Sequence, residues 1–164
     1  MVTMRLSTHY VFTTGMLSIL GWGTNFYYGL ILASLISLSS NTIIDRLGHE
    51  VRGGYVRRTP RTHTLGRSIL WGLIPSFFIF LFLFLVSGGL LFQILSMGIV
   101  AGPSHLLLDA FTEKGIYVKN GGRWTRYALA HFRYNNPFAN GAAIITGVLL
   151  MLLSLYLRGQ LTLI

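Results

Sequence analysis

The chain has 164 residues, of which 52% are hydrophobic and only 10% are charged, whereas soluble globular domains carry about 25% charged residues. This scarcity of charge excludes an ordinary water-soluble domain, so we expect residues 1–164 to form a single integral membrane domain. The formal net charge of +9 favours an anionic partner, and the absence of cysteine excludes disulfides and thiolate metal sites.

The first apolar stretch runs from Tyr10 to Ser39. It is longer than the roughly 20 residues that one helix needs to cross a bilayer, and a segment of small and polar residues interrupts it at 21–25. We therefore expect two helices, over about 8–20 and 25–40, joined by a turn. One long, bent helix is the alternative.

Three further apolar runs follow, at about 68–86, 90–112 and 141–157. The first two are separated only by Ser87, Gly88 and Gly89, so they are expected to form a hairpin whose open ends lie on one side of the membrane. The fold class is therefore all-α, a multi-pass transmembrane bundle of about five helices.

Basic residues gather in two loops, from Arg46 to Arg67 and from Lys114 to Arg133. Lys and Arg are enriched in cytoplasmic loops, so we expect a multi-pass protein of the cell membrane with both loops cytoplasmic. The expected partners are membrane lipids, whose anionic headgroups would contact the arginines. A specific anionic ligand is the alternative. We expect no specific nucleic acid partner, and the sequence does not indicate an oligomeric state.

The few histidines and carboxylates occur in pairs. His105 and Asp109 are four residues apart, and Glu113 is four further on, so the three would share one face of the fourth helix. Asp45 and His49 have the same spacing after the second apolar run. Imidazole and carboxylate groups are what a metal site without cysteine requires, and they suit zinc or manganese.

The predicted topology brings two more histidines to the same membrane face. His9 would lie at the start of the first helix and His63 at the start of the third, so both could join the two pairs in one interfacial site. A bend at Pro103 could direct His105 inward. The plainer interpretation is that the pairs are ion pairs between helix ends, with His9 as a packed side chain.

Glu50 and Glu113 are candidate general bases, and His131 is a third candidate catalytic residue that headgroup contact would also explain. Other classes are disfavoured. The glycine pairs at 53–54 and 121–122 lack a strand context or a following Gly-Lys-Ser/Thr, so no phosphate-binding loop is visible, and GxSxG is absent. A transporter is disfavoured because no charged residue falls near mid-membrane.

Four segments of the chain resemble a known family: SNTIIDRLGHE, RRTPRTHTLGRS, GPSHLLLDAFTEKGIYV and ALAHFRYNNP. The resemblance is to an archaeal membrane-protein family of unknown function, which is similar to the YdjM-like membrane-bound, metal-dependent hydrolases. Its most specific part is the SHxxxDxxTxxG pattern, carried here by Ser104, His105, Asp109, Thr112 and Gly115.

The resemblance also implies metal ligands. His63 matches the second histidine of the wider family's HRxxTHS motif, Asp45 matches the last aspartate of its PDxD motif, and His9 matches an early histidine. Two departures stand out. An arginine of the 57–58 pair replaces the first histidine, and the first aspartate of PDxD has no carboxylate counterpart, so His49 and Glu50 are the candidate substitutes.

The leading hypothesis is a membrane-embedded, metal-dependent hydrolase with a His/Asp site at the cytoplasmic face. A divalent ion would lower the pKa of bound water toward ~7 and so supply hydroxide, and nearby arginines would hold a lipid or phosphoester substrate. The alternative is a non-enzymatic membrane scaffold that binds anionic lipid or a partner through its Arg-rich loops. The expected ligands are His63, His105 and Asp109 with Asp45 or His49.

Overall fold

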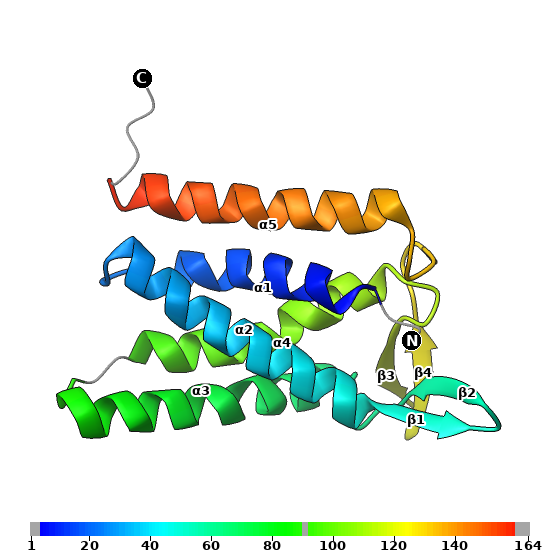
Figure 1. The fold of residues 1–164 in the computed structure, drawn as a ribbon. Helices are drawn as coiled ribbons and strands as arrows, with labels where there is room; N and C mark the ends of the chain where they lie inside the picture. The colour runs from blue at the N-terminus through cyan, green and yellow to red at the C-terminus, as the bar shows by residue number, and fades with distance from the viewer. Residues whose placement is uncertain (1–3, 90–91, 160–164) are drawn as a thin grey trace.

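The computed structural model describes residues 4–89 and 92–159. In this part of the chain, five helices run side by side, and two small antiparallel hairpins lie together at one end of the bundle, which we call the hairpin end (Figure 1). The elements are α1 (Leu6–Leu20), α2 (Phe26–Gly48), β1 (His49–Arg52), β2 (Tyr55–Arg58), α3 (Leu65–Ser87), α4 (Phe92–Ala110), β3 (Ile116–Asn120), β4 (Arg123–Tyr127) and α5 (Pro137–Leu157).

The turn predicted at 21–25 is confirmed, because α1 ends at Leu20 and α2 begins at Phe26. The Asn25 side chain caps α2 by accepting a hydrogen bond of 2.9 Å from the Tyr27 backbone N–H. The predicted end of this second helix near residue 40 is wrong. The helix continues to Gly48 because Ile44, which follows Ile36 at helical spacing, is also fully buried. This extension places Asp45 on a helix.

The other helix boundaries differ less from prediction. α3 begins three residues before position 68, and α5 begins four residues before position 141. In α5, Asn136 caps the helix by accepting a hydrogen bond of 3.0 Å from the Ala139 backbone N–H. α4 ends at Ala110 rather than 112. Its predicted start at residue 90 lies outside the described residues, as do the ends of the predicted domain at 1–3 and 160–164.

The two hairpins correct the expectation of a purely helical fold. Gly53 and Gly54 form the turn between β1 and β2 with φ of +57° and +78°, and Gly121 and Gly122 form the turn between β3 and β4 with φ of +52° and +84°. Two-residue hairpin turns favour positive φ at both positions, and glycine adopts it without steric cost. The expectation that these glycine pairs lack a strand context was therefore wrong.

Small residues let the helix backbones approach one another closely. A Cβ at Gly102 of α4 would lie only 1.9 Å from the backbone oxygen of Ser68 in α3. A Cβ at Gly15 of α1 would lie 2.3 Å from the backbone oxygen of Gly147 in α5. These glycines therefore allow α3 to pack closely on α4 and α1 on α5, while the longer apolar side chains point outward.

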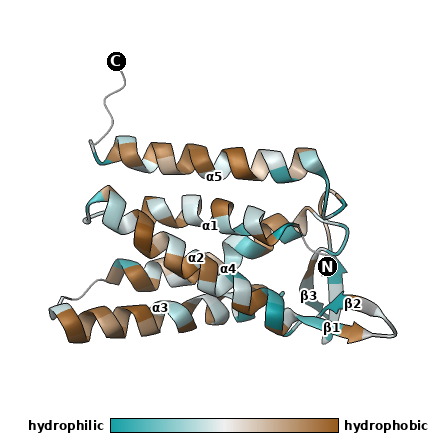
Figure 2. Ribbon diagram, in the orientation of Figure 1, coloured by the Kyte–Doolittle hydropathy of each residue, from teal (hydrophilic) through white to brown (hydrophobic). Residues whose placement is uncertain are grey.

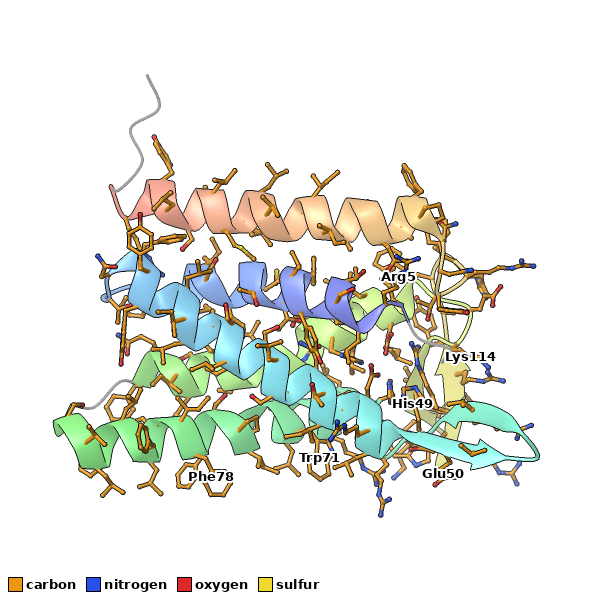
Figure 3. The ribbon with its side chains drawn as sticks, viewed as in Figure 1. Arg5, His49, Glu50, Trp71, Phe78 and Lys114 are labelled. Carbon is orange, nitrogen blue, oxygen red and sulfur yellow. The ribbon has the colours of Figure 1, made fainter. Side chains whose placement is uncertain are left out.

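Three of the described helices, α2, α3 and α5, are long and apolar enough to cross a membrane. Figure 2 shows the apolar residues along these helices. Phe78 on α3 is 64% exposed and points away from the bundle (Figure 3), and Ile145 on α5 is 61% exposed. Exposed side chains of this size on long helices are typical of a surface that contacts lipid.

Candidate metal centre

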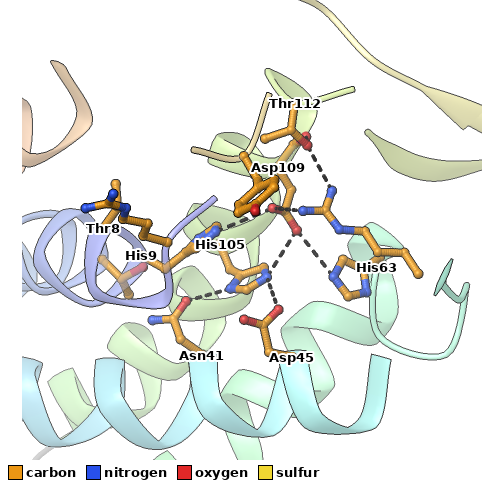
Figure 4. Close-up of polar contacts among 12 residues, drawn as sticks. Thr8, His9, Asn41, Asp45, His63, His105, Asp109 and Thr112 are labelled. Atoms are coloured by element: carbon orange, nitrogen blue, oxygen red, sulfur yellow. Dashed lines mark hydrogen bonds and ion pairs between the residues drawn. The ribbon is translucent and has the colours of Figure 1, made fainter. Parts of the chain in front are cut away.

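Five ionisable side chains from different parts of the chain meet inside the hairpin end of the bundle (Figure 4). α1 contributes one, α2 one, the segment between β2 and α3 one, and α4 two. Four are fully buried, and the side chain of the fifth, from α2, is 13% exposed. We call this set the His/Asp cluster; it consists of His9, Asp45, His63, His105 and Asp109.

Asp109 lies at the centre of the His/Asp cluster. Its Oδ2 is 3.2 Å from His105 Nε2 and 3.3 Å from His63 Nε2, and its Oδ1 is 3.4 Å from His9 Nε2. His105 Nε2 also lies 3.6 Å from Asp45 Oδ1. The rings of His9 and His105 stack with centroids 4.1 Å apart. Four imidazole and carboxylate groups thus surround the space around His105 Nε2.

Helix geometry explains two of these positions. His105 and Asp109 are one turn apart on α4, which runs through Pro103 without ending. Asn41 and Asp45 have the same spacing on α2, and both face His105: Asn41 Oδ1 is 2.7 Å from His105 Nδ1. The two α2 residues therefore lie at opposite nitrogen atoms of the His105 ring, Asn41 at Nδ1 and Asp45 at Nε2.

His63 is placed by close packing against the end of α2. A Cβ at Gly48 would lie 2.1 Å from Thr62 Oγ1 and 2.4 Å from His63 Cε1. The Thr62 hydroxyl donates a hydrogen bond of 2.9 Å to the backbone oxygen of Ile44. Only glycine at position 48 leaves room for Thr62 and His63 to pack against the end of α2.

Hydrogen bonds at the outer side of two rings determine which nitrogen carries the proton. The Asn41 amide nitrogen donates to the Ser37 backbone oxygen at 2.8 Å, so Asn41 Oδ1 faces His105 Nδ1 as an acceptor. Thr62 Oγ1, whose own proton goes to Ile44, likewise accepts from His63 Nδ1 at 2.8 Å. In the neutral rings, the Nε2 atoms of His63 and His105 therefore carry lone pairs.

His49 lies beside the cluster, and its Nδ1 likewise faces a hydrogen-bond acceptor. Its Nδ1 is 2.6 Å from the backbone oxygen of Asp45, which can only accept, and its ring centroid is 5.3 Å from that of His63. Its Nδ1 is also 3.8 Å from Asp45 Oδ1. A third imidazole thus has its Nδ1 occupied by an acceptor and its Nε2 left as a lone-pair atom.

The Nε2 atoms of these rings have no hydrogen-bond partner among the described residues. Among the buried polar side-chain atoms of the described residues that lack a hydrogen bond, all but Ser40 Oγ belong to the His/Asp cluster, to His49 or to Arg58. Nε2 lone pairs and carboxylate oxygens both need a positive or proton-bearing partner. A metal cation in this buried space would give all of these atoms a partner. Asn41 and Thr62 would then be the outer groups that orient the ligands.

The spacing of the atoms fits a small metal ion. Metal bonds of about 2.0–2.2 Å place neighbouring ligand atoms of a tetrahedral site about 3.3–3.6 Å apart. Three separations in the cluster, from His105 Nε2 and His63 Nε2 to the two aspartates, are 3.2, 3.3 and 3.6 Å. Two groups of three have ligand atoms within 4.8 Å of one another: His9, His105 and Asp109, and Asp45, His63 and His105.

Arg58 enters the cluster from β2 and is only 4% exposed. Its Nη2 forms an ion pair with Asp109 Oδ1, and its Nη1 donates to Gly115 O at 2.7 Å and to Thr112 Oγ1 at 3.1 Å. The Tyr117 hydroxyl donates to the Arg58 backbone oxygen at 2.9 Å. Thr112 and Gly115 of the SHxxxDxxTxxG pattern thus hold the arginine that orients Asp109.

The electrostatics of the site favour a cation. With both aspartates ionised and the imidazoles neutral, the buried charges are two carboxylates and one guanidinium, which sum to −1. Burial lowers the pKa of His63 below its ordinary value of 6.5, and burial also lowers the pKa of His49. Both rings are therefore neutral near pH 7, and the neutral imidazole is the form that binds metal.

Three residues predicted to be catalytic lie outside the cluster. Glu50 is exposed on β1. Glu113 is half exposed, and its carboxylate lies 3.7 Å from Arg133 Nε. His131 is exposed and has a positive φ of 55°. The structure brings none of the three toward the His/Asp cluster, so a catalytic role for them stays a prediction.

Sequence reasoning missed Arg58, Asn41 and Thr62. The sequence placed Arg58 in the basic loop and in the arginine pair that replaces the first histidine of HRxxTHS, and neither interpretation predicted its contact with Asp109. Strand alternation would have separated its side chain from that of Arg57. Asn41 carried a usable signal, since it stands four residues before Asp45 on the same helix face. Thr62 carries no signal of its role beyond its position next to His63.

In the described residues, fold and site together define a class: a bundle of five mostly apolar helices that encloses a buried His/Asp cluster at its hairpin end. Residues 4–108 match a family described as protein of unknown function (DUF1286). This match covers more than half of the chain, and the chain belongs to that family. It includes four members of the cluster and ends one residue before Asp109. No curated protein and no solved structure matches the chain.

Proposed function

We propose that the chain is a multi-pass protein of the cell membrane whose His/Asp cluster binds one divalent metal ion and uses it for hydrolysis. The membrane assignment is supported by α2, α3 and α5, which are long and apolar enough to span. The basic segments at both hairpins lie at the same end of the bundle (Figure 1). By the positive-inside rule, this end is the cytoplasmic one.

One observation supports the metal assignment: buried histidine Nε2 atoms and carboxylate oxygens converge without hydrogen-bond partners among the described residues. If the cluster were only a tie between helix ends, each acceptor would face a donor, as Asp109 Oδ1 faces Arg58. The separations fit tetrahedral geometry, so zinc is the first candidate and manganese the second. The ligands are His63, His105 and Asp109 with Asp45, and His9 lies next to them.

Hydrolysis is favoured over a closed structural site because the cluster reaches the surface on one side. Asp45 and His49 line a pocket of about 570 Å³, through which water and substrate could arrive. A bound divalent ion would supply a Lewis acid and lower the pKa of bound water toward ~7. The protein itself holds the ligands through Asn41 and Thr62 and neutralises Asp109 through Arg58.

Metal analysis of the full chain, purified in detergent, tests this proposal. We expect about one zinc or manganese ion per chain, and a loss of at least about tenfold in bound metal for His105→Ala, because a ligand has been removed. The matched control is His131→Ala, which removes an exposed histidine and should retain the metal. Absence of metal from the wild-type protein after incubation with zinc and with manganese would favour the scaffold.

A further inference from the structure

The pocket that reaches the His/Asp cluster is lined by the segment before α1 and its first two turns, by the last turns of α2, by β1 and β2, and by the segment before α5. We call it the side pocket. Asp45, a member of the cluster, and His49 both line it. Arg5 and His49 both lie at the hairpin end of the bundle (Figure 3). The remaining lining residues are Met4, Leu6, Tyr10, Thr42, Arg46, Val56 and Tyr134.

The lining of the side pocket combines cationic and apolar groups. Arg5 and Arg46 contribute the two cations, and Asp45 is the only carboxylate among the lining residues. Met4, Leu6 and Val56 are aliphatic or thioether side chains, and two tyrosines add aromatic surface. An anion would be attracted to the arginines and to a metal-loaded cluster, whereas an alkyl chain would be accommodated by the apolar groups.

We propose that the side pocket binds a lipid phosphate monoester, with the phosphate toward Asp45 and the arginines and the lipid chain along the apolar lining. This inference rests on the proposed metal-dependent hydrolysis and names its substrate class. Arginine recognises phosphate through paired, charge-assisted hydrogen bonds. A free phosphate ion would leave most of a pocket of about 570 Å³ and all of its apolar lining uncovered.

The position of the pocket fits a substrate that stays in the bilayer. Its lining includes the start of α1 and the end of α2, which lie where the helices give way to the hairpins (Figure 1). Headgroups of membrane lipids lie at this level, while their chains extend along the helices. A lipid could therefore place its phosphate in the pocket without leaving the membrane.

The proposed reaction is hydrolysis of the ester bond to phosphorus. The oxygen of a water molecule bonds to phosphorus, and the bond between phosphorus and the lipid oxygen breaks. The lipid oxygen takes up one proton derived from that water, so the products are a lipid alcohol and inorganic phosphate. No oxidant, reductant or further co-reactant is needed.

The test uses the full chain in detergent micelles, loaded with zinc, and measures phosphate release from short-chain phosphatidic acid. Arg46→Gln and Arg5→Gln should each raise KM roughly tenfold or more, because a hydrogen bond to a charged group is lost, while the zinc content stays at the wild-type value. Arg57→Gln is the matched control, since Arg57 is an exposed arginine that does not line the pocket. Inorganic phosphate should compete only weakly.

The outcomes separate the two proposals. A protein that binds zinc but neither binds nor hydrolyses phosphatidic acid overturns the substrate assignment and leaves the metal site standing. The same holds if Arg46→Gln and Arg5→Gln behave like Arg57→Gln. Inhibition by inorganic phosphate at concentrations as low as those of the lipid substrate would contradict the role of the apolar lining. A protein that binds no metal overturns the proposed function itself, and this inference with it.

Discussion

Buried polar side chains differ in their hydrogen bonding between the rest of the bundle and its hairpin end. In the middle, Ser76 Oγ donates to the Gly72 backbone oxygen at 3.0 Å, and near the opposite end Ser154 Oγ donates to the Ser18 backbone oxygen at 2.8 Å. At the hairpin end, the inner nitrogens of the histidines and two aspartate oxygens have no hydrogen-bond partner. Apart from Ser40 Oγ, the described part of the chain concentrates its unpartnered polar atoms in one place.

This difference separates structural polar residues from a candidate site. A polar group in an apolar environment costs free energy unless it is hydrogen-bonded, so serine hydroxyls inside the bundle bond to helix carbonyls. The hairpin end departs from that rule at several neighbouring atoms, while Asn41 and Thr62 satisfy the outer nitrogens of the same rings. Such a pattern is expected where the missing partner is a ligand.

Substitution of Asp109 should have the largest effect on the hairpin end. Asp109→Asn should lose bound metal and also destabilise the protein by about 3–5 kcal/mol, because it leaves the buried Arg58 guanidinium without a counter-charge. Unfolding in detergent, followed by circular dichroism, measures the second effect. The double variant Arg58→Met with Asp109→Asn should recover part of the lost stability but none of the metal. Equal stability of Asp109→Asn and wild type would mean that this ion pair does not form.

The second prediction concerns Gly48, where packing rather than charge positions a ligand. A Cβ there would meet Thr62 Oγ1 and the His63 ring at 2.1 and 2.4 Å. Gly48→Ala should therefore displace His63, weaken metal binding by about tenfold or more and cost about 1–3 kcal/mol of stability. Metal titration and unfolding measure the two effects. The matched control is Gly66→Ala, since a Cβ at Gly66 meets nothing within 4 Å; similar behaviour of both variants would contradict this account.

The arrangement of the helices could be predicted from sequence because it depends on apolar length and on turns of small residues. The turn at 21–25 and the span at 68–86 required no knowledge of partners. His105 and Asp109 could likewise be paired, since helical spacing alone places them on one face. The metal role of these residues is a separate matter and stays a prediction.

The hairpins and Arg58 could not be predicted in the same way. Strands of four or five residues carry a weak periodic signal, and the glycine pairs at 53–54 and 121–122 were their only strong indication. The positive-inside rule explains arginines by their loop and ignores which way they point. The burial of Arg58 depends on strand register, in which it pairs with His49 while its neighbour Arg57 pairs with Glu50, and register becomes visible only in the structure.

A weaker effect is expected in the pH dependence of folding stability. Burial lowers the pKa of His63 below 6.5, so between that lowered value and 6.5 the unfolded chain binds a proton there that the folded protein excludes. Folding stability of the metal-free protein should therefore be greatest above pH 6.5 and fall as the pH decreases below it. Burial lowers the pKa of His49 as well, and its contribution has the same sign.

Thermal unfolding of the metal-free protein in detergent at pH 7.5 and pH 5.5 measures this effect, and the difference between wild type and His63→Gln isolates the contribution of one ring. We expect the wild type to lose more stability on acidification than His63→Gln does, because glutamine has no proton to take up in the unfolded chain. His131→Ala, which removes an exposed histidine, should follow the wild type. If His63→Gln and wild type lost the same stability, burial would not hold His63 neutral. A protonated His63 would then form an ion pair with Asp109. The contrast between a satisfied bundle interior and an unsatisfied hairpin end would then disappear at that residue.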